Sequence, residues 1–62
     1  MKLTERQKRF ADYYIETGNA SESYRKAGYK AQGKSVEVNA SRLLANAKVS
    51  EYIAKRMEEK DK

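Results

Sequence analysis

One pair of acidic side chains has a spacing that would suit catalysis. Asp12 and Glu16 are four residues apart, which places two carboxylates on one face of a helix. Lys8 and Arg9 lie close to them in the sequence, so we interpret the pair as part of a solvated ion-pair surface. The 62 residues include no Cys and no His, the side chains that most zinc sites and general bases use. We therefore expect no enzyme, no cofactor and no metal site.

Basic side chains are concentrated in the middle of the sequence. The net charge of the chain is +5, and residues 23–50 alone carry six bases against one acid, Glu37. The remainder holds eight bases and eight acids, so the excess belongs to this segment. Such a segment suits a polyanionic partner, although charge alone is equally compatible with a solvated basic face. The six bases are Arg25, Lys26, Lys30, Lys34, Arg42 and Lys48.

Capping and stop signals divide the chain into four predicted helices. We expect them at residues 5–17, 20–27, 36–45 and 47–58. A residue typical of a helix N-cap precedes each one: Thr4, Asn19, Ser35 and Asn46. Gly18 and Gly28 follow the first two helices and supply left-handed stops. Beyond the last helix we expect the charged tail to fray.

Apolar residues recur at helical spacing, and no strand pattern competes with them. The expected buried faces are Phe10, Tyr13, Tyr14 and Ile15; Ala20, Tyr24 and Ala27; Val36, Ala40, Leu43 and Leu44; and Val49, Tyr52, Ile53 and Met57. A chain this short encloses one core, and none of its apolar runs approaches the roughly 18 residues of a membrane span. The sequence thus predicts one all-α domain over 1–62, a small bundle of three to four helices.

The second and third predicted helices, joined by a Gly-containing connection, form a helix-turn-helix pattern, with a connection longer than the roughly 3 to 4 residues of a tight turn. In that motif the second helix enters the DNA major groove. The outward face of 36–45 suits this role. Ser41 is small enough for close approach, Arg42 can reach a guanine or a phosphate, and Val38 can touch a thymine methyl group.

Further basic residues are expected to position the protein on double-stranded DNA without reading its sequence. Lys34 and Ser35 stand at the start of the third helix, where the helix dipole favours a phosphate, and Lys30 adds charge at the same end. Arg25 and Lys26 on the second helix would contact the sugar-phosphate backbone. A second hypothesis is that Tyr24, Tyr29 and Tyr52 stack on unpaired nucleotides, but each lies on or beside an apolar face, which favours a core role.

A series of short motifs gives the sequence a family resemblance. In order they are Leu3-Thr4-Glu5-Arg6-Gln7-Lys8-Arg9-Phe10, Tyr14, Gly18-Asn19-Ala20, Ala27-Gly28-Tyr29, Ser41-Arg42-Leu43-Leu44-Ala45-Asn46 and Lys48-Val49. Taken together, these motifs make the chain resemble, over about residues 3–53, the N-terminal DNA-binding domain of phage terminase small subunits. The resemblance implies a non-catalytic viral or prophage protein that recognises the packaging-initiation site on DNA and works with a large subunit holding the ATPase and nuclease.

The resemblance also implies regions that this sequence does not contain. Small subunits of the family continue into an oligomerisation region that builds a homo-oligomeric ring, and into a tail that contacts the large subunit. We therefore expect an excised, monomeric domain from a protein of the bacterial host cytoplasm, without a membrane partner. The alternative is a helical protein-docking or dimerisation module whose basic face binds an acidic partner. Packing of helix 47–58 decides between the two, because an exposed apolar face there would imply a protein partner.

Overall fold

Four α-helices account for most of the chain. The computed structural model describes residues 3–30 and 33–60, which form α1 (Glu5–Thr17), α2 (Ala20–Lys26), α3 (Lys34–Ala45) and α4 (Ala47–Lys60). The predicted all-α class and the bounds of the first helix are confirmed. Helix α2 ends one residue earlier than predicted and α4 extends two residues further. Residues 61–62 of the predicted frayed tail lie outside the described residues.

Helix α1 is fixed at both ends by the residues that the sequence indicated. The Gln7 backbone N–H donates to Thr4 Oγ1 at 3.2 Å, and the Thr4 N–H donates to Gln7 Oε1 at 3.0 Å. At the other end Gly18 takes a φ of 70°, where a side chain would be strained, and its N–H donates to the Tyr14 carbonyl. Asn19 then caps α2 by accepting from the Glu22 N–H at 3.0 Å. Two residues thus suffice to turn the chain.

The start of α3 differs from the prediction. Gly33, with a φ of 63°, is the N-cap, and no side chain caps the helix there. Prediction of Ser35 as the cap was wrong, because the positive φ of Gly33 already turns the backbone and brings Lys34 and Ser35 into the first helical turn. The prediction for α4 is confirmed: Asn46 Oδ1 accepts from the backbone N–H groups of Lys48 and Val49.

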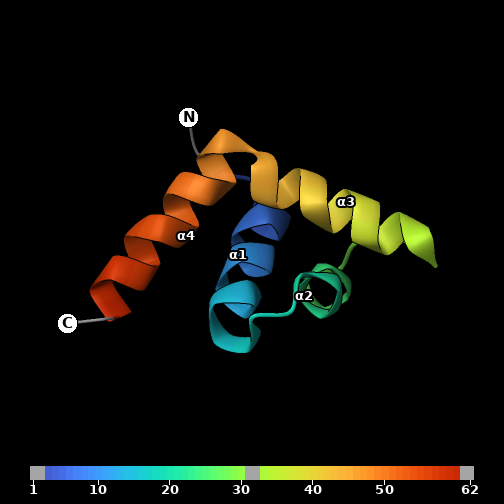
Figure 1. Ribbon diagram of the computed structural model, residues 1–62, viewed down its shortest axis with the longest axis horizontal. Coiled ribbons are helices and arrows are strands. Elements are labelled where there is room, and N and C mark those ends of the chain that lie inside the picture. Colours follow the sequence, from blue (N-terminus) through green and yellow to red (C-terminus); the bar gives the residue numbers. More distant parts are fainter. Residues whose placement is uncertain (1–2, 31–32, 61–62) are drawn as a thin grey trace.

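The core gathers around α1. In Figure 1, α1 stands in the middle, with α4 on one side and α2 on the other, while α3 runs across from α4 and over α2. The molecule measures only 36 × 25 × 17 Å. The buried apolar residues are Phe10, Ala11, Tyr24, Ala27, Val36, Ala40, Val49 and Ile53. None of the helices in the described part of the chain has both the length and the apolar character that crossing a membrane requires.

Helix α4 contributes its apolar face to this core. Val49 and Ile53 are buried with Phe10, and Tyr52 packs against the same cluster. Met57 departs from the prediction, since its side chain is 42% exposed. In Figure 1, α4 diverges from α1 towards its C-terminal end, the part of the helix to which Met57 belongs.

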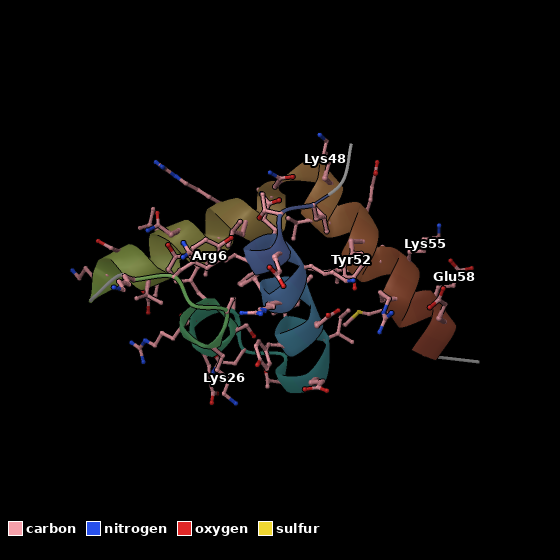
Figure 2. All side chains as sticks on the ribbon, turned by 180° about the vertical axis from the view of Figure 1, so that it is seen from behind. Arg6, Lys26, Lys48, Tyr52, Lys55 and Glu58 are labelled. Atoms are coloured by element: carbon pink, nitrogen blue, oxygen red, sulfur yellow. The ribbon has the colours of Figure 1, made fainter. Side chains whose placement is uncertain are left out.

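A hydrogen bond joins α4 to α1 at the margin of the core. The Tyr52 hydroxyl donates to Asp12 Oδ1 at 2.7 Å, bridging residues 40 positions apart in the sequence. Partial burial raises the pKa of Tyr52, and the hydrogen bond to Asp12 and the charge of that carboxylate raise it further. Figure 2 shows Tyr52 lying between the two helices.

A pair of stacked tyrosine rings fixes the connection between α2 and α3. Tyr24 of α2 is 7% exposed, and its ring lies parallel to that of Tyr29 with 4.5 Å between centroids. The guanidinium of Arg6, from the first turn of α1, lies 6.0 Å from the Tyr29 centroid. Tyr29 therefore links the connection to both α2 and α1, which restricts how α3 can leave the bundle.

Replacing Tyr52 by Phe should remove the α1–α4 hydrogen bond and lower the free energy of unfolding by about 1 kcal/mol at neutral pH. Because the folded-state pKa of Tyr52 is raised, its stabilising contribution is present below its ordinary pKa of 10.0 and is lost as the pH rises through the higher folded value. Y52F should therefore lose less stability than the parent between neutral pH and pH values above 10. Urea denaturation across this range measures both effects.

Tyr14 offers the control, because its ring stacks on Phe10 and its hydroxyl takes no part in the α1–α4 bond. Y14F should retain the alkaline loss of stability seen in the parent. Equal alkaline loss in Y52F and Y14F would contradict the assignment.

Replacing Tyr29 by Leu should destabilise the domain by about 1 kcal/mol, since an aromatic pair contributes about 0.5 to 1.5 kcal/mol beyond the area that it buries. Y29F keeps the ring and should stay close to the parent. Thermal unfolding followed by circular dichroism compares the three proteins. If Y29L were as stable as Y29F, the stack would not hold the connection.

Candidate nucleic-acid interface

The exposed residues of α3 form one continuous face centred on Val38. Helical neighbours at three, four and seven positions share a face, and around Val38 these are Lys34, Ser35, Ser41, Arg42 and Ala45. All six are exposed, and we call them the α3 outer face. On the opposite side, Val36 and Ala40 are buried in the core. The structure therefore brings together five of the eight residues predicted to contact DNA: Lys34, Ser35, Val38, Ser41 and Arg42.

An apolar side chain lies at the centre of this face. Val38 is 51% exposed, although the core needs apolar residues and has few. Ser41 and Ala45 beside it are small, so a flat surface can approach the helix backbone closely. Small, apolar and basic residues on one exposed helix are the combination that base edges in a major groove require.

The cations beside Val38 are not neutralised within the molecule. Across residues 3–30 and 33–60 the ion pairs are Arg9–Glu5 and Lys26–Glu22, both between neighbouring turns of one helix. Lys34 and Arg42 take part in neither, and the same holds for Arg25 and Lys30, which are also exposed. Four positive charges are thus available to an external anion.

Lys26 differs from the other predicted contacts. Its ammonium lies 3.6 Å from a Glu22 carboxylate oxygen and 5.8 Å from the centroid of the Tyr13 ring. These contacts turn the side chain toward α1, and Figure 2 shows it on the side of α2 remote from α3. The structure does not bring Lys26 together with the α3 outer face.

The acidic pair on α1 does not form the ion pairs expected from the sequence among the described residues. Asp12 accepts the hydrogen bond from Tyr52, and Arg9 pairs with Glu5. Asp12 and Glu16 line an open groove of about 530 Å³ between α1 and α4, together with Ile15, Arg56 and Glu59. In the described part of the chain no group of three potential ligands is arranged to hold a metal ion.

A second hollow lies at the edge of α3 that faces the connection, and we call it the Tyr29 hollow. It has a volume of about 340 Å³ and is lined by Tyr24, Tyr29, Asn39, Arg42, Leu43 and Asn46. Burial of Tyr24 and its stacking on Tyr29 argue against the hypothesis that these rings stack on unpaired bases, because the stacked faces are already used.

Two residues around this hollow were missed by sequence reasoning. Asn39 stands three positions before Arg42, a spacing that would have placed it beside that predicted contact. Arg6 is brought to Tyr29 only by the packing of α1 against the connection, which has no local signal in the sequence.

Comparison with known proteins identifies the family. The family model described as terminase small subunit matches residues 3–62. The chain is 50% identical over 58 residues to the terminase small subunit of Staphylococcus phage 80alpha, covering 92% of this chain and 38% of that protein. It is 46% identical over 52 residues to the PBSX phage terminase small subunit of Bacillus subtilis (strain 168), covering 84% of this chain and 19% of that protein.

The chain thus spans well under half the length of these relatives. No solved structure gives a significant match. The family match over residues 3–62 includes every residue of the α3 outer face and of the Tyr29 hollow. On this evidence the chain belongs to the terminase small subunit family.

Proposed function

We propose that this domain binds double-stranded DNA through α2 and α3, with the α3 outer face in the major groove. The observation that carries the proposal is the exposed, unneutralised set of cations around Val38 on a helix whose other side is buried. Figure 1 shows α2 nearly end-on while α3 lies in the plane of the view, a steep crossing compatible with a helix-turn-helix. Val38, Ser41 and Arg42 face the bases.

The remaining contacts position the domain on the phosphates. Lys34 and Ser35 lie in the first turn of α3, where free backbone N–H groups and the helix dipole attract an anion. Lys30 and Arg25 are exposed, take part in no ion pair with a described residue, and add positive charge on the connection and on α2. Lys26 contributes less, because Glu22 already compensates its charge.

Within its family the domain recognises the packaging-initiation site on phage or prophage DNA, in the cytoplasm of the bacterial host. It does not cut DNA, and it works with a terminase large subunit that regions outside this chain contact. The curated relatives are much longer than the chain, which agrees with a full protein that also forms a homo-oligomer. Several domains held together would bind DNA more tightly than this monomeric one by avidity.

The protein-docking alternative is less well supported by the position of α4. Val49 and Ile53 are buried in the core, so most of the apolar face of α4 is not offered to a partner, and only Met57 near its C-terminal end is exposed. Val38, the other exposed large apolar side chain among the described residues, lies on the same face of α3 as Lys34 and Arg42.

A chemical-shift titration with short duplex DNA at two salt concentrations tests the proposed face. Changes should centre on the α3 outer face, Arg25 and Lys30, and binding should weaken steeply with salt as counterions are released. Changes centred on α1 or α4 would relocate the interface. Absence of any change at low salt would refute DNA binding by this domain and favour the docking alternative.

Replacing Lys34 by Ala should weaken binding to all duplexes alike and reduce the slope of log affinity against log salt by about 1, the effect of one lost phosphate contact. Lys55 is the matched control, since Figure 2 shows it on α4, away from α3. Fluorescence anisotropy over a salt series measures the slopes. A K55A variant that lost as much slope as K34A would show that only overall charge matters.

A further inference from the structure

The edge of α3 that borders the Tyr29 hollow carries two polar side chains in register. Asn39 and Arg42 are three positions apart, and both line the hollow together with Asn46 one turn later. The three positions project from one side of the helix, between the buried Val36–Ala40 side and the exposed Val38. This edge is therefore a second strip of α3, adjoining the α3 outer face through Arg42.

Asn39 and Arg42 are not engaged by the rest of the described chain. Within residues 3–30 and 33–60, neither the Asn39 amide nor the Arg42 guanidinium forms a side-chain hydrogen bond. Arg42 also forms no ion pair with a described residue. Asn46 differs, because its Oδ1 is the cap of α4. Two planar groups capable of bidentate hydrogen bonding thus line the same hollow, and neither has a hydrogen-bond or ion-pair partner among the described residues.

The surroundings restrict where these two groups point. Asn39 is half-buried, and Tyr29 and Leu43 line the same hollow. The stack of Tyr29 on Tyr24, with Arg6 nearby, holds that boundary in place. Because Asn39 is half-buried beside this packed aromatic pair, its amide has fewer orientations to lose on binding than a fully exposed side chain has. Fixed geometry of this kind is what sequence discrimination requires.

We propose that Asn39 and Arg42 are the residues that read base identity, Asn39 contacting adenine and Arg42 contacting guanine. The pairing follows from geometry: an Asn amide matches the N6 and N7 positions of adenine, and a guanidinium matches O6 and N7 of guanine. Three residues of helix rise about 4.5 Å, close to the roughly 3.4 Å between stacked base pairs. The preferred site therefore contains an adenine and a guanine in neighbouring base pairs. This inference rests on the proposed DNA binding and goes beyond it by assigning specificity to a residue outside the α3 outer face.

Selection from a random duplex library, followed by affinity measurement on single-base variants of the selected site, tests the assignment. The parent should select a site with neighbouring adenine and guanine. N39A should lose the adenine preference, a discrimination of about 5-fold to 150-fold, while keeping the guanine preference and the salt slope of the parent. R42K keeps the positive charge but not the planar fork, so it should lose the guanine preference alone.

Ser50 provides the matched control, as an exposed serine outside both the hollow and the α3 outer face. S50A should keep both preferences. An N39A variant that kept the adenine preference as fully as S50A would overturn the assignment while leaving DNA binding intact. Uniform weakening by R42K across all sequences would make Arg42 a phosphate contact and would also overturn it. Failure of the parent to bind any duplex would instead refute the proposed function. Circular dichroism of each variant confirms that the fold is retained.

Discussion

Burial of Val36 and Ala40 in the core that surrounds Phe10 is the constraint on which the arrangement of this domain depends. These two residues hold one side of α3 inside the bundle, so the opposite side, centred on Val38, must face outward. Hydrophobic stabilisation scales with the apolar area removed from water, and few apolar residues are buried, so a small number of side chains holds α3 in this orientation. Hydrogen bonds and ring stacking at the margins, through Tyr52 and Tyr29, supplement it.

The distribution of charge also distinguishes the outward side of α3 from the rest of the domain. Cations that lie near a carboxylate on their own helix, such as Arg9 and Lys26, are compensated locally. Glu37 is the one acid of α3, and neither Lys34 nor Arg42 forms an ion pair with it or with another described residue. An anion approaching the domain is therefore attracted to the helix whose outer side is free, and the attraction weakens with salt because these charges are solvent-exposed.

Local signals in the sequence predicted the helices and the buried faces well, since caps such as Thr4 and apolar spacing such as Val49–Ile53 act within one or two turns. These local signals could not predict features that depend on contacts between residues far apart in the sequence. Gly33 displaced Ser35 as a cap through its backbone angle, and Met57 is exposed near the C-terminal end of α4, where that helix diverges from α1. Placement of Lys26 against Tyr13 and of Asn39 beside Tyr29 required the packing of separate helices. Sequence spacing alone therefore found most of the candidate interface but not its edge.

The proposed interface is small, and the α3 outer face and the edge of α3 beside the Tyr29 hollow have different parts in it. A single DNA-binding module covers about 600 to 1,000 Å² of its own surface. The whole chain exposes 4771 Å², so such an interface takes a modest part of it. In the proposed complex, phosphate contacts by exposed lysines would hold the domain on any duplex, whereas discrimination needs groups with fixed directions. The half-buried Asn39 beside the Tyr24–Tyr29 stack meets that need better than the long, exposed side chain of Lys34.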